Sequence, residues 1–310
     1  MSIPTVIGRF APSPTGPLHF GSMLAAVASF LDARAAGGQW RLRIDDVDRT
    51  RCRPGAEAHI RATLSAFGLH WDGPVQYQDT RREVYADALE QLRRRDLAFP
   101  CGCTRREVAA AGQRGPAGMI YPGTCRAGLG PGRTARSWRF RSDRINRGDG
   151  LITFADRRLG PQQLNLAAAI GDFILRRADG LHAYPLAMVL DDAEIGVTDI
   201  VRGADLLPAT APQVALQQAL GLATPRYLHL PVALDAQGRK LSKTNGAAAV
   251  DAEHPAATLH AVLTHLGQNP PAALTRATPR EILDWAIAHW RPAALPHTDS
   301  LTASPLPGHL

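Results

Sequence analysis

The sequence predicts an α/β protein built on a parallel, nucleotide-binding sheet, and three observations support this fold class. Short apolar runs alternate with segments of helical spacing over roughly the first hundred residues, in the order strand, helix, strand, helix. A proline-rich turn joins the first strand to the first helix, and acidic residues directly follow the second strand. The carboxyl ends of parallel strands are where such sheets bind ligands. A small cysteine-containing insertion and a short helical C-terminal region complete the predicted architecture.

The first turn, Arg9 to Met23, reads Arg-Phe-Ala-Pro-Ser-Pro-Thr-Gly-Pro-Leu-His-Phe-Gly-Ser-Met and follows a predicted strand, Val6-Ile7-Gly8. A helix is expected after Gly21, which places His19 and Ser22 at its mouth. A helix N-terminus offers unpaired N–H groups and a positive dipole end, which suit a phosphate, and a glycine lets a ligand approach the backbone. An ordinary strand-to-helix connection is the alternative, but three prolines in such a turn favour a binding function.

The second predicted strand, Trp40–Ile44, ends in Asp45-Asp46-Val47-Asp48. On residues alone, a magnesium or amino-group site and an ordinary acidic turn are equally supported. Two helices follow, Pro54–Phe67 and Thr80–Arg95, and the second is expected to open with a capping box at Thr80-Arg-Arg-Glu.

The insertion carries Cys101-Gly-Cys103, a short helix capped by Thr104-Arg-Arg-Glu107, and Tyr121-Pro-Gly-Thr-Cys125. Three cysteines within 25 residues suggest metal ligands rather than a disulfide. However, C-x-C is tighter than the usual C-x₂-C, and no histidine lies between residues 71 and 181 to complete the set. From the residues alone, zinc and free thiols are equally supported. Cys52 is distant and is expected to be a small buried apolar residue.

The sheet is expected to resume with Arg136–Arg141 and Phe173–Arg177. An Asp-Gly turn after the latter predicts a hairpin whose second strand, Leu181–Leu190, carries Tyr184. A further strand, Thr198–Gly203, delivers Arg202 at its end. An isolated Tyr or Arg usually lies at the surface or at the edge of a core.

A helix from Thr210 to Leu220, capped by Thr210-Ala-Pro-Gln213, and an apolar run, Tyr227–Leu234, lead to a turn and then to Lys240-Leu-Ser-Lys-Thr244. Lys240 and Lys243 are the only lysines among 35 basic residues. Solvated surface lysines are the ordinary interpretation, but their isolation favours a function, because a mobile ammonium can follow a moving phosphate.

Composition limits the classes of function. The charge of +7 and pI near 9.7 suggest a polyanionic partner, although Arg-rich coding bias would give the same values. The sequence predicts no leader and no membrane span, so we expect a cytoplasmic protein. Four cysteines, three of them clustered, argue against a disulfide framework.

The turn ending in His19-Phe-Gly-Ser22 resembles the first signature of class I aminoacyl-tRNA synthetases, and Lys240-Leu-Ser-Lys-Thr244 resembles the second. Arg9-Phe-Ala-Pro-Ser-Pro-Thr-Gly is similar to the glutamyl subgroup. The resemblance covers roughly residues 5 to 245 and implies a Rossmann-like catalytic domain. It departs at Ser22, where many relatives have His or Gly, and at Thr244.

The resemblance also implies roles for individual residues. Asp45, where Glu is common in relatives, matches the carboxylate that holds the substrate α-amino group, and an Arg fork suits a side-chain carboxylate. The implied L-glutamate site is Arg9, Ala11, Ser13, Asp45, Tyr184 and Arg202. The implied catalytic residues are His19, Ser22, Lys240 and Lys243, and those for ATP are His19, Gly21 and Lys243. Short glutamyl-type relatives carry a Cys-x-Cys…Tyr-x₃-Cys zinc site, which implies one structural Zn²⁺ on Cys101, Cys103, Tyr121 and Cys125.

Only 66 residues follow the lysine loop, whereas a discriminating glutamyl-tRNA synthetase carries a large helical anticodon-binding region there. The resemblance is therefore to short paralogues that activate glutamate without tRNA and attach it to queuosine in the anticodon of tRNA(Asp). The alternatives are a truncated synthetase charging a tRNA 3′ end and a non-catalytic paralogue that binds tRNA or an amino acid. The implied partners are ATP with Mg²⁺, L-glutamate and queuosine-containing tRNA(Asp), and we expect a monomer.

These interpretations divide the chain into five expected parts and no anticodon-binding domain. They are the two halves of the catalytic domain (1–100 and 136–205), a zinc-binding insertion between them (101–135), a helical region with the lysine loop (206–250) and a C-terminal helical tail (251–310).

Overall fold

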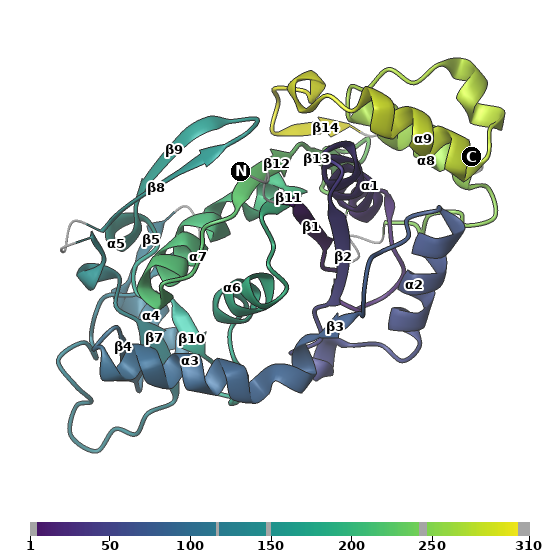
Figure 1. Cartoon of the computed structure of the whole chain (residues 1–310). Coiled ribbons are helices and arrows are strands. Elements are labelled where there is room, and N and C mark those ends of the chain that lie inside the picture. The colour runs from purple at the N-terminus through teal and green to yellow at the C-terminus, as the bar shows by residue number, and fades with distance from the viewer. Residues whose placement is uncertain (1–4, 116–117, 147–149, 242–246, 303–310) are drawn as a thin grey trace.

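The computed structural model describes residues 5–115, 118–146, 150–241 and 247–302, which form an α/β protein with two parallel sheet segments (Figure 1). The first segment has the order β1 (Ile7–Phe10), β2 (Gln39–Ile44), β3 (Gln76–Tyr77), all parallel. The second has the order β11 (Asp199–Gly203), β12 (Arg226–Leu230), β8 (Leu151–Asp156) and β9 (Gly160–Asn165), of which only β9 is antiparallel to its neighbour. The Thr198 N–H donates to the Ile7 carbonyl at 2.9 Å, so the two segments meet at β1 and β11.

Two apolar cores cover opposite faces of this sheet. Successive residues Ile200 and Val201 on β11 belong to different cores, as side chains that alternate along a strand must. One core receives α1 (Phe20–Ala35), α2 (Ala56–Ala66), α8 (Pro255–His265) and α9 (Pro279–His289). The other receives α3 (Arg82–Arg94), α6 (Tyr184–Glu194) and α7 (Leu207–Leu220).

The insertion lies at the end of the molecule away from α8 and α9 (Figure 1). Next to it, β4 (Ala98–Cys101), β7 (Ser137–Phe140) and β10 (Ile174–Arg176) form a separate antiparallel sheet, so the prediction that the parallel sheet resumes over 136–141 and 173–177 is wrong. Alternation along a strand does not reveal the direction of its neighbours. Smaller elements complete this end: α4 (Arg105–Ala111), β5 (Gln113–Gly115), β6 (Gly118–Ile120) and α5 (Leu166–Ala169).

The predicted second strand of the hairpin, Leu181–Leu190, is wrong from Tyr184 onward, because α6 begins there. The Asp-Gly turn is present, and Arg176 and His182 form an antiparallel bridge across it. Pro185 then stands at the start of a helix, where its missing N–H costs nothing and its fixed φ favours helical backbone. Tyr184 is therefore the first residue of a helix and not part of a strand.

Of the three predicted helix caps, one is present. Thr104 forms a complete capping box, as does Thr278 at the start of α9. Thr80 does not: its hydroxyl donates to the Tyr77 carbonyl and α3 starts at Arg82. Thr210 lies inside α7, which starts at Leu207, and its hydroxyl contacts Arg202 instead.

The elements that were not predicted include the β8–β9 hairpin, α8, and the parallel pair of β13 (Val232–Leu234) with β14 (Ser300–Thr302). The pair brings the described C-terminal residues against the strand that leads into the lysine loop. Among the described helices, none combines the length and apolar character needed to cross a bilayer.

Candidate active site

The predicted site residues meet in one cleft, a cavity of about 470 Å³ at the carboxyl ends of β1 and β11 and the N-terminus of α1. All but one of the residues predicted to bind glutamate, to bind ATP or to act in catalysis line it. They are Arg9, Ala11, Ser13, His19, Gly21, Ser22, Asp45, Tyr184, Arg202 and Lys240. The exception, Lys243, lies outside the described residues. Segments as far apart as the first strand and the lysine loop thus line the same cavity.

His19 and Gly21 form the N-terminus of α1. His19 is the N-cap of α1, and its Nδ1 accepts the Ser22 N–H at 3.2 Å, so a neutral ring carries its proton on Nε2. A Cβ at position 21 would lie 3.0 Å from the Leu241 carbonyl oxygen and 3.2 Å from the His19 ring. Glycine therefore allows the start of the lysine loop to lie directly over the helix N-terminus.

A buried ion-pair network forms the floor of the cleft. Arg43 donates to both Asp45 and Asp192 at 2.7 Å, and Arg9 Nε lies 3.2 Å from Asp192. Burial raises the pKa of Asp45 to about 6, and the charge of Arg43 only partly opposes it. Burial also acts to raise the pKa of Asp192, but Arg9 and Arg43 outweigh it and hold that pKa below its usual value.

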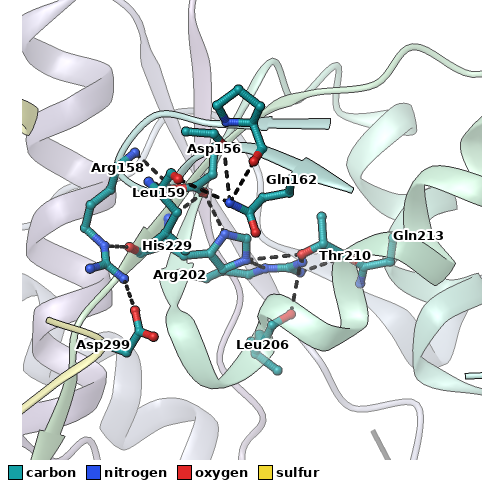
Figure 2. Close-up of polar contacts among 12 residues, drawn as sticks. Asp156, Arg158, Leu159, Gln162, Arg202, Leu206, Thr210, Gln213, His229 and Asp299 are labelled. Carbon is teal, nitrogen blue, oxygen red and sulfur yellow. Dashed lines mark hydrogen bonds and ion pairs between the residues drawn. The ribbon is translucent and has the colours of Figure 1, made fainter. Parts of the chain in front are cut away.

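Arg202, at the end of β11, has a different environment. Its side chain is buried, with 4% of the residue exposed, and its three hydrogen bonds reach neutral groups (Figure 2). Nε donates to His229 Nε2 at 3.2 Å, Nη1 to Gln213 Oε1 at 2.8 Å and Nη2 to Thr210 Oγ1 at 2.8 Å. Burial lowers the pKa of Arg202. In the described part of the chain, this arginine lines the cleft without an ion-pair partner.

A second cavity, of about 680 Å³, adjoins the cleft. The two share Asp45, Tyr184 and three other lining residues: Ser13, Thr15 and Arg51. From there the second cavity extends toward the insertion, where Arg105, Arg139 and Arg177 line it. Tyr184 is 38% exposed and stands between the two cavities.

The described start of the lysine loop follows a turn in which the Gly238 N–H donates to the Asp235 carbonyl, as predicted. Lys240 Nζ lies 2.6 Å from Asp205, a residue that also lines the cleft. The ammonium group of Lys240 is therefore part of an ion pair between two residues that line the cleft.

The clustered cysteines form a candidate metal centre. The sulfur atoms of Cys101, Cys103 and Cys125 all lie within 4.8 Å of one another, and those of Cys103 and Cys125 are 3.7 Å apart. Tetrahedral zinc with Zn–S bonds of about 2.3 Å separates two sulfurs by about 3.8 Å. The Tyr121 hydroxyl lies 3.4 Å from the Cys101 sulfur and 3.6 Å from that of Cys103. The spacing therefore fits a metal ion held by these side chains.

The fourth cysteine, Cys52, is partly exposed and lines the second cavity, so the expectation of a small buried residue is wrong. The expectation rested on the general tendency of cysteine to be buried. Cys52 lies in the loop after β2, where its side chain is partly exposed.

Four residues of the cleft and of the metal centre were not singled out by the sequence. Arg43 lies on β2 between apolar residues, and it is fully buried. Asp192 and His229 lie in apolar segments, where a buried charged or polar residue is itself a signal of a site. Arg139 lies 4.0 Å over the Tyr121 ring and donates to the Cys101 sulfur at 3.3 Å. Although burial opposes it, hydrogen bonds from Tyr121, the Cys103 backbone and Arg139 lower the pKa of Cys101 to about 7.

Comparisons with known proteins agree with this geometry. Residues 5–120 and 136–270 match the family described as tRNA synthetases class I (E and Q), catalytic domain. The glutamyl-Q tRNA(Asp) synthetase of Aromatoleum aromaticum is 56% identical over 287 residues, 93% of this chain and 89% of the relative. That of Thiobacillus denitrificans is 50% identical over 97% of this chain and 98% of its own length.

Among solved structures, the glutamate-tRNA synthetase of Elizabethkingia anophelis matches with a TM-score of 0.77 and 27% identity, over 95% of this chain and 67% of that one. A glutamate tRNA ligase of Elizabethkingia meningosepticum, solved in complex with its amino acid, matches with a TM-score of 0.78, 27% identity, 97% of this chain and 67% of its own. The chain therefore belongs to the class I tRNA synthetases of the E and Q group and, within it, to the glutamyl-Q tRNA(Asp) synthetases.

Proposed function

We propose that this protein activates L-glutamate with ATP in the absence of tRNA and transfers the glutamate to queuosine in the anticodon of tRNA(Asp). The observation that carries the choice of amino acid is Arg202, a buried cation in the cleft with neutral hydrogen-bond partners. A buried charge without a counter-ion is costly, and a carboxylate at the end of the substrate side chain would compensate it. The names of the relatives supply the acceptor.

Glutamate fits between two charges of opposite sign. Asp45 would accept the α-ammonium group, while Arg202 and Arg9 would hold the side-chain carboxylate. Arg9 lines the cleft, and its hydrogen bond to Asp192 uses Nε, so its terminal nitrogens would bind the ligand. Ala11, Ser13 and Tyr184 would line the path between these charges.

ATP would place its phosphates at the mouth of α1, near His19, Gly21 and Ser22. The α-carboxylate oxygen of glutamate then attacks the α-phosphorus, and pyrophosphate leaves. Lys240 and Lys243 would stabilise the charge that develops on the phosphates. Mg²⁺ would be bound with ATP, because this cation usually enters such sites on substrate phosphates.

The larger adjoining cavity would receive the acceptor nucleoside. It shares Asp45 and Tyr184 with the cleft, so a hydroxyl of queuosine entering there lies beside the adenylate. That hydroxyl attacks the glutamyl carbonyl carbon, an ester forms, and AMP leaves. Arginines on the cavity wall would contact nucleic-acid phosphates, which gives affinity but little sequence preference.

The cysteine cluster would hold one structural zinc ion through Cys101, Cys103, Tyr121 and Cys125. Four protein ligands fill a tetrahedral zinc site, so the ion would stabilise the insertion without a coordination position for substrate. The insertion supplies Arg105 to the acceptor cavity, and the adjacent β7 supplies Arg139.

The test uses labelled glutamate and ATP with three acceptors: tRNA(Asp) from cells able to make queuosine, tRNA(Asp) from cells unable to make it, and tRNA(Glu). Label should appear on the first alone, and glutamate-dependent exchange of pyrophosphate into ATP should proceed without any tRNA. Label on unmodified tRNA, or on a 3′-terminal adenosine sensitive to periodate, would instead identify a truncated synthetase. A protein without exchange activity would be a non-catalytic paralogue.

A further inference from the structure

We propose that Asp156 and His229 are positioning residues that hold the Arg202 guanidinium in one orientation without neutralising it, and so set the preference for a carboxylate over an amide. This inference rests on the proposed role of Arg202 in binding the glutamate side chain. Neither Asp156 nor His229 lines the cleft, and both are buried.

The Asp156 carboxylate is itself fixed by the backbone. Its Oδ1 accepts the N–H groups of Arg158 and Leu159 at 3.0 and 2.9 Å, and its Oδ2 accepts the N–H of His229 at 3.0 Å. The same Oδ2 lies 2.7 Å from Nδ1 of the His229 ring. Figure 2 shows the ring between Asp156 and Arg202.

This contact determines the tautomer of His229. A carboxylate can only accept, so the ring proton sits on Nδ1 and Nε2 presents its lone pair. Nε2 accepts the Arg202 Nε–H at 3.2 Å. Burial, the main cause, lowers the pKa of His229 and keeps the ring neutral next to the guanidinium.

This arrangement leaves two N–H groups of Arg202 for the ligand. Arginine has five N–H groups, and the described contacts use one on Nε, one on Nη1 and one on Nη2. One N–H therefore remains on each terminal nitrogen, which is the pair that can bind two carboxylate oxygens together.

The imidazole also acts as a spacer. A carboxylate placed directly against Arg202 would compete with the substrate for the same charge, as Asp192 does at Arg9 and Arg43. With the ring of His229 between them, Asp156 orients the guanidinium through a neutral acceptor. Gln213 and Thr210 complete the set of neutral acceptors, so the positive charge stays available to a ligand.

Arg158, whose side chain is 1% exposed, fixes the backbone of His229 through hydrogen bonds. Its Nε donates to the His229 carbonyl at 2.5 Å, and its terminal nitrogens reach the carbonyls of Pro296 and Thr298 and the carboxylate of Asp299. The β8–β9 turn and the C-terminal segment thus hold the strand that carries the ring.

The experiment measures glutamate-dependent and glutamine-dependent pyrophosphate exchange for His229→Leu and His229→Gln. Leu removes the acceptor for the Arg202 Nε–H, so the glutamate KM should rise about tenfold or more, with a smaller change in kcat and an unchanged KM for ATP. The ratio of kcat/KM for glutamate over glutamine should fall by a similar factor. The carbonyl of Gln can replace Nε2, so His229→Gln should recover part of both.

Leu228→Val is the matched control, because Leu228 precedes His229 on β12 and its side chain packs in the apolar core without lining the cleft. It should lower stability while leaving the preference for glutamate unchanged. Arg202→Ala separates the two proposals: if it keeps the preference for glutamate, the proposed function is wrong.

If Arg202→Ala loses the preference while His229→Leu retains both KM and preference, Arg202 binds the substrate but the positioning role is refuted. Should His229→Leu fail to fold, the ¹⁵N spectrum of histidine-labelled wild-type protein decides. A proton on Nδ1 of His229 is expected, and a proton on Nε2 would overturn the inference.

Discussion

Arg43 Nε lies 2.7 Å from the Asp45 carboxylate, and this buried ion pair orients a carboxylate of a residue that lines both the cleft and the acceptor cavity. Arg43 itself is fully buried, and its Nη1 binds Asp192 at 2.7 Å. The arginine therefore holds Asp45 in place from behind, while burial, the larger effect, raises the pKa of Asp45 to about 6.

The raised pKa predicts an acid limb in glutamate activation. Protonated Asp45 is neutral and cannot pair with the substrate ammonium, so kcat/KM for glutamate should fall as the pH is lowered through about 6. Glutamate itself stays ionised there, since its side-chain pKa is near 4.3. The measurement is the pH profile of pyrophosphate exchange at saturating ATP.

Asp45→Asn should be slow at every pH and should lack this limb. Asp46→Asn is the control, because Asp46 accepts the Asp79 N–H and lines neither the cleft nor the acceptor cavity. If the Asp45→Asn variant still loses activity near pH 6, the titrating group lies elsewhere.

Two substitutions of Arg202 should distinguish the contribution of its positive charge to glutamate recognition from that of the planar guanidinium. Arg202→Lys keeps one positive charge but loses the planar fork, so glutamate kcat/KM should fall by roughly 10² while glutamate remains preferred over glutamine. Arg202→Ala should abolish glutamate activation and leave ATP binding nearly intact. Equal exchange rates of the wild-type protein with glutamate and glutamine would remove Arg202 from side-chain recognition.

The parts of the site that the sequence predicted are those carried by local signals. His19, Gly21 and Ser22 lie in one turn whose prolines and helix mouth are readable over a few residues, and the structure places all three at the cleft. Asp45 follows its strand directly, and the parallel pairing of β1 and β2 brings both strand ends to the same edge.

What the sequence could not predict depends on contacts between distant segments. Arg43 and Asp192 are 149 positions apart, and Asp156 and His229 are 73 apart, so the sequence around each residue does not reveal its partner. The error at Leu181–Leu190 has the same origin. An apolar run after an Asp-Gly turn suits a strand, but packing against α3 and α7 makes it a helix.

The metal centre predicts a difference between the clustered cysteines and the fourth one. Protein purified without chelator should contain about one zinc per chain, and Cys125→Ser should lose it and melt about 5 °C or more below wild type. Cys52→Ser should keep the metal and the melting temperature, because Cys52 lies outside the cluster. A metal-free preparation with unchanged melting would show that the cysteines are simply free thiols.

The lysine loop gives the last prediction, which compares the two lysines of the chain. Lys243→Ala should slow adenylate formation by roughly 10² or more, the usual cost of removing one charge-stabilising group, with little change in the KM for glutamate. Lys240→Ala should have a smaller effect, because the charge of Lys240 is already paired with Asp205 at 2.6 Å. Single-turnover formation of glutamyl adenylate measures both. If Lys243→Ala raised only the KM for glutamate, Lys243 would bind the amino acid rather than the phosphates. If instead Lys240→Ala were the slower variant, the Asp205 pair would have to open before the transition state, and the first lysine would be the one that follows the phosphates.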